Sequence, residues 1–330
     1  MTRRIHGRLA LGAALLGAGL LIGCGESTTG PVERIIVPPG ATFATVTDSL
    51  AAHGLVRNRL WFKLRARLMG VDRSVHAGVY EVNRAMSSGE VLAILAAGQS
   101  AVIRFTVPEG LTLFDVADLA TQRLGIPRDS ILAAARDTVL IDSLGLPGRT
   151  LEGFLHPDTY QLPANITGRE VVRMMAEGFR HTWDSTWTAR LDSVGMSQLE
   201  IVTLASIVEG EARADDERET IASVYLNRLH RGMALQADPT VQYAILLRTG
   251  DRKPRLYDKD YQTPSPYNTY LQPGLPPGPV NSPSRRSIQA SLYPAVTPYL
   301  FFVAGPDGRH VFTRTFEQHL QAISRVRRPK

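Results

Sequence analysis

The chain has 330 residues, 44% of them hydrophobic and 21% charged, so it can bury a sizeable core and is long enough for about two domains. This composition excludes a disordered or collagen-like chain. The formal net charge of +6 falls to +3 once three arginines near the N-terminus are set aside, and part of the remainder lies in the basic stretch 325–330. Such a small surplus gives no reason to assign a nucleic-acid partner.

The first 24 residues have the pattern of an export signal. Three arginines within the first eight residues precede an apolar run, residues 9–23, which carries no acidic side chain and ends at Cys24. Residues 21–24 are similar to a bacterial lipobox, in which the cysteine becomes the lipidated first residue of the mature protein. The alternative is an uncleaved membrane-spanning helix, although the run is shorter than the ~20 residues that a span requires. In either case we predict that residues 1–24 export the chain and anchor it to a membrane.

Cys24 is the only cysteine of the chain, so no intramolecular disulfide can form and stability must come from core packing. The polar residues 25–31 predict a short flexible tether between the anchor and the first domain. No other long apolar run follows, which excludes a polytopic membrane protein.

Residues 32–99 alternate strand and helix signals. A strand (34–37) leads through a Pro/Gly turn into a helix and a basic amphipathic stretch (60–68), and a second strand (78–82) precedes a last helix (88–97). The order strand, helix, helix, strand resembles a LysM-like module, a common binder of N-acetylated glycans. The alternative is that the VPxGxT pattern at the turn is only a favourable strand-to-helix connection.

The same turn recurs 70 residues later. VPPGAT at residues 37–42 matches VPEGLT at residues 107–112, and in each copy a threonine stands where it can cap the helix that follows. We therefore predict a second, related strand-turn-helix module over residues 100–150, with its strand at 102–107.

A clearly marked helix begins after residue 195. Ser197 and Glu200 form a capping-box pair ahead of apolar residues at helical spacing, and a second helix is predicted over residues 216–230. The apolar positions of the first helix are Ile201, Leu204, Ala205, Val208 and Ala212. On a helix, Glu209 lies roughly 80° from the centre of this stripe, at the border of the expected core.

Partial burial raises the pKa of a carboxyl group, and a general acid/base that works near neutral pH needs such a pKa. This position makes Glu209 a candidate acid/base. From spacing alone, the alternative is a solvated residue at the rim of the helix face. Further along, the proline-rich residues 264–283 precede a strand at 299–304, and long ordered loops of this kind shape binding clefts.

The segment LASIVEGEA at residues 204–212 resembles the signature helix of the YceG-like endolytic murein transglycosylases, the MltG family, in which the glutamate after Ser-Ile-Val is catalytic. That glutamate is Glu209 here. Further blocks are similar to those of the family and occur in its order: LEGFLHPDTY (151–160), VYLNRL (224–229), LQADPTVQY (235–243), SPYNTY (265–270), GLPPGP (274–279), FVA (302–304), and then Gly308, His310 and Phe312. The resemblance covers residues 32–319.

This resemblance implies an α+β fold, in which an N-terminal LysM-like module is followed by a mixed α/β YceG-like catalytic domain over residues 100–330, with its core at 151–320. It implies an endolytic lyase that cleaves the β-1,4 bond between N-acetylmuramic acid and N-acetylglucosamine within glycan strands. The products carry 1,6-anhydro ends, and the cut ends the elongation of nascent strands. Neither a cofactor nor a metal is implied.

The resemblance also implies a place in the cell envelope. The expected partners are peptidoglycan glycan strands, the inner membrane that holds the anchor, and peptidoglycan synthases, with the catalytic body in the periplasm or extracytoplasmic space. The family usually carries a single membrane-spanning helix, and the shorter run before Cys24 leaves open whether the anchor is a helix or a lipid.

In this chemistry one carboxyl group serves both proton transfers, in contrast to the two-carboxylate glycosidases. Polar groups should surround the developing positive charge, and the candidates for substrate positioning are Gln236, Asp238, Tyr267, Asn268 and Thr269. The alternative for these five is a purely structural role in loops. Glu152 and Glu211 are further candidates, as groups that support the acid.

Two other functions stay open at this point. One is a non-catalytic peptidoglycan-binding or scaffold lipoprotein, and the other is a muramidase that hydrolyses the bond with Glu209 as acid and Asp238 or Glu152 as the second carboxylate. Metal catalysis is poorly supported, because the eight histidines form no HExxH motif or close cluster. Ser206 lies in no Gly-x-Ser-x-Gly elbow, and the chain has no Gly-rich phosphate loop.

Overall fold

The computed structural model describes residues 31–38, 41–73, 75–76, 78–98, 102–163 and 165–326. The predicted export segment, Cys24 and most of the predicted tether lie outside the described residues, so the predictions made for them stay predictions. The chain divides into two units, of which the first ends at Gly98 and the second begins at Gln99. Only residues 77–79 depart from this order, because they are grouped with the second unit.

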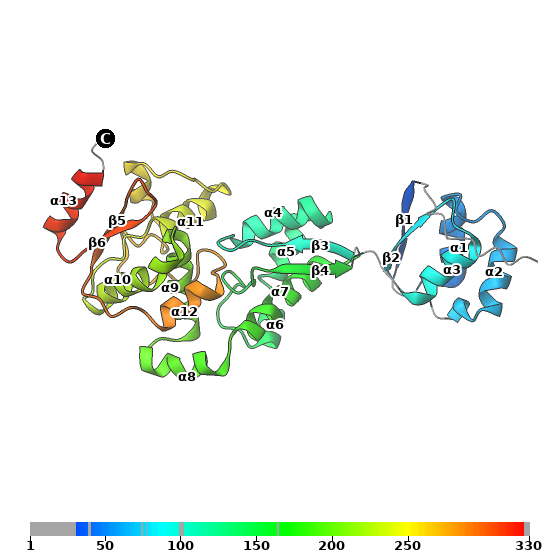
Figure 1. The fold of residues 1–330 in the computed structure, drawn as a ribbon, viewed down its shortest axis with the longest axis horizontal. Helices are drawn as coiled ribbons and strands as arrows, with labels where there is room; N and C mark the ends of the chain where they lie inside the picture. The colour runs from blue at the N-terminus through cyan, green and yellow to red at the C-terminus, as the bar shows by residue number, and fades with distance from the viewer. Residues whose placement is uncertain are drawn as a thin grey trace, which may run out of the picture. The chain divides into compact units, whose positions relative to one another are not determined.

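The first unit is built on a two-stranded sheet of β1 (Val32–Val37) and β2 (Gly78–Asn83), as Figure 1 shows. Its helices are α1 (Phe43–Ala52), α2 (Arg59–Leu68), α3 (Ser88–Ala97) and a single 3-10 turn, η1 (Val71–Arg73). All these elements contribute to one apolar core, which includes Ile35, Leu50, Phe62, Tyr80 and Leu92. The predicted order of strand, helix, helix and strand is confirmed, whereas the likeness to a LysM module stays a prediction.

The second unit begins with another two-stranded sheet. β3 (Val102–Thr106) and β4 (Thr159–Pro163) run antiparallel, with Val102 opposite Pro163 and Thr106 opposite Thr159. The accompanying helices are α4 (Leu113–Leu124), α5 (Arg128–Ala134), α6 (Thr138–Leu144) and α7 (Gly168–Thr182). Apolar side chains of these helices and of β3 and β4 form the largest core cluster of the described residues.

The remaining elements surround one central helix, α9 (Gln198–Glu211), which packs against α10 (Arg218–His230), α11 (Asp238–Thr249) and α12 (Arg285–Leu292) (Figure 1). The last antiparallel pair is β5 (Phe301–Ala304) and β6 (His310–Thr313). The other elements are α8 (Ser185–Val194), η2 (Asp215–Glu217), η3 (Asp258–Gln262) and α13 (Phe316–Val326). Helices combined with separate small sheets confirm the predicted α+β class.

The two turns of the predicted repeat begin their helices by the same local chemistry. The hydroxyl of Thr42 accepts a hydrogen bond from the backbone N–H of Thr45 at the start of α1, and Thr112 forms a capping box with Asp115 at the start of α4. The strands before the turns nevertheless pair differently, β1 with β2 and β3 with β4. Similar local sequences therefore serve two separate sheets.

α9 is buried on all its faces, which corrects the expectation of a helix with a single apolar stripe. All eight residues from 201 to 208 are buried, including Thr203 and Ser206. The Thr203 hydroxyl donates to the Leu199 carbonyl and the Ser206 hydroxyl to the Thr203 carbonyl, both at 2.7 Å, so these polar groups are satisfied within the helix. Because α9 is enclosed by its neighbours, its last turn, which carries Glu209, is held in a fixed place.

Among the described residues, no single helix has both the length and the apolar character needed to cross a membrane. The consecutive helices α8 and α9 reach that combination only as a pair, and the pair is bent by 91°.

A glycine before β4 ties a distant loop to this part of the unit. Gly153 has a φ of +79°, a left-handed conformation that other L-residues avoid, and a Cβ atom placed there would lie 2.4 Å from the Cβ of Pro279. The Pro279 ring therefore packs directly on the glycine. This contact helps to position residues 278–284, the loop that leads into α12.

Gly153→Ala should destabilise the protein by more than the backbone strain that an alanine causes at a positive φ. Gly195 is a matched control, because it also has a positive φ, +71°, but nothing lies within 4 Å of a Cβ added there. We expect Gly195→Ala to lower the free energy of unfolding by about 1 kcal/mol. Gly153→Ala should lower it clearly further, since Pro279 has to move. Urea denaturation followed by circular dichroism measures both, and equal losses would show that the Pro279 contact does not constrain the fold.

Candidate active site

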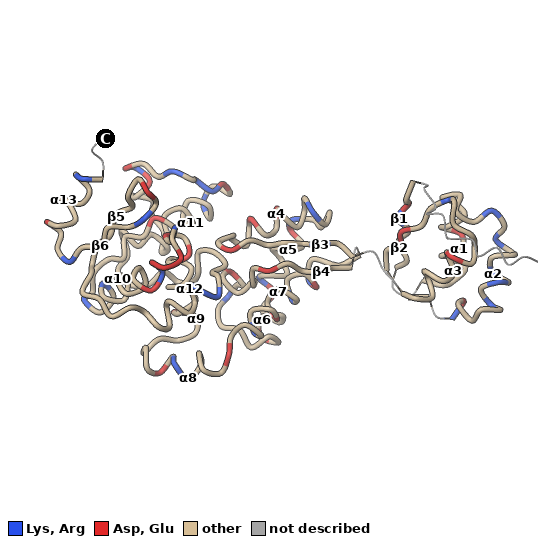
Figure 2. The backbone as a smooth tube through the Cα atoms, in the orientation of Figure 1, with Lys and Arg blue, Asp and Glu red and all other residues tan. Residues whose placement is uncertain are grey.

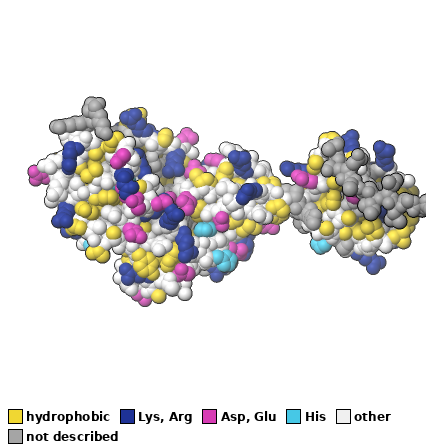
Figure 3. All heavy atoms as spheres, in the orientation of Figure 1, with side chains coloured by type: hydrophobic (Ala, Val, Ile, Leu, Met, Phe, Trp, Pro, Cys, Tyr) yellow, Lys and Arg dark blue, Asp and Glu magenta, His cyan; other side chains and the backbone are white. Residues whose placement is uncertain are grey.

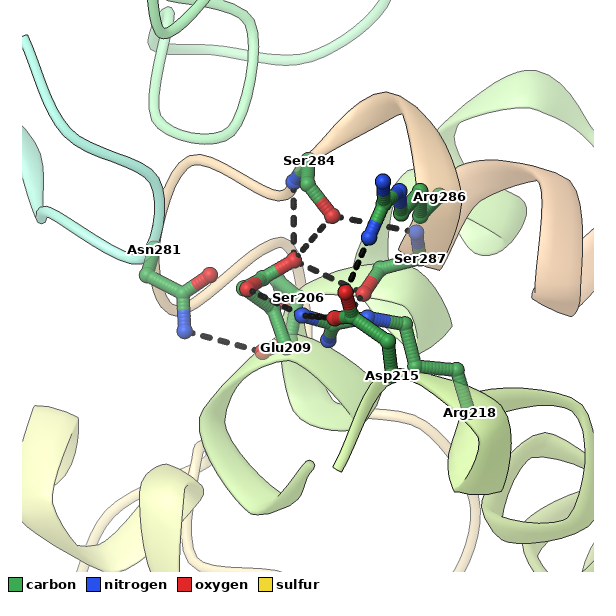
Figure 4. Close-up of polar contacts among 8 residues, drawn as sticks. All are labelled: Ser206, Glu209, Asp215, Arg218, Asn281, Ser284, Arg286 and Ser287. Carbon is green, nitrogen blue, oxygen red and sulfur yellow. Dashed lines mark hydrogen bonds and ion pairs between the residues drawn. The ribbon is translucent and has the colours of Figure 1, made fainter. Parts of the chain in front are cut away.

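Glu209 is held in the last turn of α9 by contacts to α12 and α10. Its side chain is only 8% exposed, and its Oε2 accepts hydrogen bonds from the backbone N–H of Ser284 (2.9 Å), the Ser284 hydroxyl (2.5 Å) and the Ser287 hydroxyl (2.7 Å). The other oxygen, Oε1, lies 3.4 Å from Nη2 of Arg218 (Figure 4). The carboxyl group is therefore buried yet surrounded by donors.

The N-terminus of α12 supplies most of these donors. Ser284 is the N-cap of α12, and its hydroxyl also accepts the N–H of Ser287. The positive end of a helix dipole favours a negative group beside it, so α12 is oriented to stabilise the Glu209 carboxylate.

The loop before α12 is fastened to α9 one turn ahead of Glu209. The Ser206 hydroxyl accepts the N–H of Val280 at 3.0 Å, and the Ser206 carbonyl accepts the Asn281 side-chain N–H at 2.8 Å. Ser206 and Glu209 are three residues apart and so share a helix face. Ser206 and Glu209, spaced as Ser-x-x-Glu, thus bind the loop before α12 at two points.

Five buried polar atoms have no hydrogen-bond partner within the described part of the chain. Nε of Arg218, Oδ1 of Asn281 and Oγ of Ser282 belong to α10 and to the loop before α12, and the other two are Oγ1 of Thr313 and Nδ1 of His319. Native proteins pair most buried polar groups, so these atoms are positions where bound water would complete the hydrogen bonding.

A second carboxylate, Glu109, approaches Glu209 from the turn between β3 and α4. The next residue, Gly110, donates its N–H to the Ser282 carbonyl at 2.8 Å, and a Cβ placed on Gly110 would lie 3.8 Å from Cγ of Glu209. The pKa of Glu109 is raised above its usual value by partial desolvation and by the negative charge of Glu209. The turn therefore forms part of the wall beside the candidate acid.

Arginines balance this concentration of negative charge. Arg218 also lies 3.2 Å from Asp215, and Arg286 donates a hydrogen bond to the same aspartate (Figure 4). Both arginines act against the rise in the pKa of Glu109.

Two of the predicted positioning residues, Gln236 and Asp238, line one cavity of about 440 Å³. Glu211, predicted to support the acid, also contributes to its wall, as does Gly210, the residue after Glu209. Burial, together with the charge of Asp238, raises the pKa of Glu211 to about 7. Gln236 has a φ of +51°, a strained conformation for this residue type that is typical of functional sites. The cavity residues are therefore candidates for substrate contact.

The other predicted positioning residues have structural roles in the loop. Asn268 is fully buried and its side chain donates to the carbonyls of Tyr261 and Thr263. Thr269 is also buried, and its hydroxyl accepts the N–H of Ala237. The ring of Tyr267 packs against that of Tyr243, with 4.9 Å between the two ring centroids. None of the three is among the residues lining the cavity next to Gly210.

Glu152 is also held by hydrogen bonds within the fold. Its buried carboxyl group accepts the N–H of Leu113, at the first turn of α4, and the Tyr243 hydroxyl at 3.0 Å. Burial outweighs these bonds and raises the pKa of Glu152 to about 8. In this position Glu152 caps α4 and joins it to α11.

Sequence reasoning missed Arg218, Ser284 and Ser287, which contact the Glu209 carboxyl group directly. It also missed Glu109, whose pKa is affected by the charge of Glu209. Two signals were available. The repeat places Glu109 where the first copy has Pro39, and the SPSRRS segment at residues 282–287 has the Ser-Pro-Ser pattern of a helix start.

Among the described residues, no group of three or more histidine, cysteine, aspartate or glutamate side chains is arranged to hold a metal ion.

The sequence matches the family model described as the YceG-like family over residues 35–325. The chain is 29% identical, over 330 residues, to the endolytic murein transglycosylase of Bacillus subtilis strain 168, and the match covers 95% of this chain and 90% of that protein. It is 28% identical to the endolytic murein transglycosylase of Streptococcus pneumoniae serotype 2 strain D39, with 86% of this chain and 56% of that longer protein covered. A crystal structure of a yceG-like protein from Listeria monocytogenes matches with a TM-score of 0.62 and 28% identity, over 89% of this chain and 100% of that one.

Glu152→Gln should make the protein relatively more stable as the pH rises. The pKa of Glu152 is raised from 4.5 to about 8 by folding, so its contribution to stability is full below its unfolded pKa and is lost as pH rises through the folded pKa. Glutamine keeps an acceptor for Leu113 and carries no charge. We expect the melting temperature of the variant, relative to wild type, to increase by several degrees between about pH 5 and about pH 8.

The control is Glu170→Gln, because hydrogen bonds from Thr167 lower the pKa of Glu170. Its effect should therefore stay constant over the same pH range. A Glu152→Gln difference that is equally constant would contradict the protonated state that burial imposes on Glu152.

Proposed function

The chain belongs to the YceG-like family, and we propose that it is an endolytic murein transglycosylase. In this role it is a lyase that cleaves the β-1,4 bond between N-acetylmuramic acid and N-acetylglucosamine within a glycan strand and leaves a 1,6-anhydro end. The observation that carries the proposal is the buried Glu209 carboxyl, which two serines and an arginine hold at the end of α9. The named relatives support it, since they match along most of this chain.

Glu209 serves both proton transfers. As a general acid it gives its proton to the leaving glycosidic oxygen while the bond from that oxygen to the anomeric carbon breaks. The ionised carboxylate then takes the proton of the 6-hydroxyl of the same muramic acid, whose oxygen bonds to the anomeric carbon and closes the anhydro ring. Glu209 regains its proton, and neither water nor a second nucleophile is consumed.

The serines suit a group that changes charge during the reaction. A hydroxyl both donates and accepts, so Ser284 and Ser287 can donate to the carboxylate of Glu209 and turn to accept from its protonated form. The backbone N–H of Ser284 and the Arg218 guanidinium stabilise the charged intermediate state. A fixed environment of this kind needs little rearrangement between the two proton transfers.

The substrate would occupy the surfaces on both sides of the end of α9. Glu211, Gln236 and Asp238 would contact an adjoining sugar in the cavity, whose volume of about 440 Å³ is in the range of small-molecule sites. The positive charge that develops at the anomeric carbon would face Glu109 as well as Glu209.

The cellular setting is part of the same proposal. We propose that residues 1–24 hold the protein at the inner membrane, through a membrane-spanning helix or a lipid on Cys24, with the catalytic body on the extracytoplasmic side. The first unit would bind glycan as a LysM-like module, and peptidoglycan synthases would supply the nascent strand. These assignments follow from the export pattern and from the order of elements in the first unit.

Glu209→Gln should fold normally and lose the activity. Glutamine keeps the size of the side chain and an acceptor for the Ser284 N–H, but it cannot donate and recover a proton. We expect the release of anhydro-ended muropeptides from purified sacculi to fall by about 100-fold or more, while the melting temperature changes by only a few degrees.

The control is Glu177→Gln, which changes a half-exposed glutamate of α7 and should retain full activity. Mass spectrometry of the digest measures the product. Full activity of Glu209→Gln would refute the mechanism.

Glu109→Gln separates the lytic reaction from hydrolysis by two carboxylates. In the lytic reaction Glu109 only adjusts the charge around Glu209, so we expect anhydro ends and a rate within about tenfold of wild type. A hydrolase that used Glu109 as its second carboxylate would give reducing ends and would lose as much activity as Glu209→Gln. The masses of the products distinguish the two, because hydrolysis adds one water.

A further inference from the structure

α2 of the first unit exposes a row of large apolar side chains. Leu60 is 82% exposed, Trp61 59%, Leu64 48% and Leu68 78%. The opposite side of the helix carries the buried Phe62 and Ala66, which belong to the core of the unit. The apolar row is therefore not needed to close that core.

The exposed row forms one continuous stripe. With about 100° between successive helical residues, the four side chains fall within an arc of roughly 100° that faces directly away from Phe62 and Ala66. Hydrophobic side chains also reach the surface of this unit in the view of Figure 3. Exposed apolar residues are ordinary when scattered, but a contiguous stripe indicates a binding surface.

Basic side chains flank the stripe on both sides. Lys63 and Arg67 follow one edge of the stripe and Arg65 the other, whereas Arg59 lies nearer the buried side. α2 contains no acidic residue, and Figure 2 shows its basic residues as blue segments. Arg59 and Arg67 lie 3.3 and 3.8 Å from Asp48 and Asp72, but exposed ion pairs of this kind contribute little to stability, so both arginines can exchange these partners for external anions.

We propose that α2 docks on the surface of a lipid bilayer that contains anionic headgroups. The leucines and Trp61 would enter the boundary between headgroups and acyl chains, and the flanking arginines and lysine would contact lipid phosphates. An apolar stripe between two basic edges is the pattern of a helix that lies in a membrane interface. A tryptophan suits this boundary because its ring is apolar and its N–H is polar.

The position of α2 along the chain supports a lipid surface as the occupant. The apolar run of residues 9–23 ends nine residues before Val32, the first residue of β1. An extended chain covers at most about 3.6 Å per residue, so this distance cannot exceed about 32 Å. If residues 9–23 are held in a membrane, the first unit stays close to the same membrane, and even a weak interface would be occupied.

The test uses the full-length chain in vesicles whose lipids carry bromine on their acyl chains, which quench tryptophan fluorescence only at close range. The chain has three tryptophans, and a Trp61→Phe variant gives the signal of Trp183 and Trp187 alone. We expect Trp61 to be quenched strongly in vesicles rich in phosphatidylglycerol and less in pure phosphatidylcholine. High salt should reduce the quenching in the anionic vesicles.

Matched variants test the stripe itself. Leu64→Gln with Leu68→Gln should abolish most of the Trp61 quenching, because both leucines are exposed and the fold does not depend on them. The control is Ile36→Gln, which changes an equally exposed apolar residue of β1, 62% exposed, and should leave the quenching unchanged.

Three results would overturn the proposal. The first is a Trp61 signal that is unquenched in both kinds of vesicle, and the second is quenching that survives the paired leucine substitution. The third is a Trp61 signal that responds to soluble chitooligosaccharide or to protein concentration instead of lipid, which would assign the stripe to glycan or to a second copy of the chain. The quenching of Trp61 does not depend on catalysis, so this test is independent of the murein transglycosylase activity.

Discussion

The candidate site depends on one interaction, the contact of the Glu209 carboxyl with the N-terminus of α12. A carboxylate that is 8% exposed is stable only if donors replace the water that it has lost, and here Ser284, Ser287 and Arg218 supply them. Much of the surrounding structure holds these donors in place. Residues 278–284 are tied to Ser206 of α9 and rest on Gly153, and the β3–α4 turn is joined to the same loop through Ser282.

The protein treats its buried glutamates in different ways. Glu152 accepts hydrogen bonds from Leu113, Tyr243 and Gly153, but burial dominates, its pKa rises to about 8, and it serves as a cap for α4. Glu211 has the Tyr225 hydroxyl as a donor and Asp238 as a neighbouring charge, and its pKa rises to about 7. Glu209 alone of the three has two hydroxyls, a backbone N–H and an arginine around one carboxyl group. The same residue type is thus given separate tasks by its neighbours.

Local chemistry in the sequence predicts where elements begin, but not what encloses them. The capping pair Ser197 and Glu200 and the threonines at 42 and 112 start helices as expected, because each cap is made within four residues. The burial of α9 on every side depends on α10, α11 and α12, which no helical periodicity reveals. The same limit applies to the site. Ser284 lies 75 residues from Glu209, and its role depends on a loop whose path is set by long-range contacts. Asn268 and Thr269 show the reverse case, since their polar side chains are used within the loop itself.

The end of α9 places Glu209 between two opposing helix fields. The C-terminus of α9 carries about half a negative charge and the N-terminus of α12 about half a positive one, so the two fields offset each other at the carboxyl group. The electrostatic field at the Glu209 carboxyl group is therefore set mainly by its nearest charged neighbours, Arg218 and Glu109. Any group that binds beside Glu209 would act on a carboxyl group whose surroundings are set by these two side chains, Arg218 and Glu109.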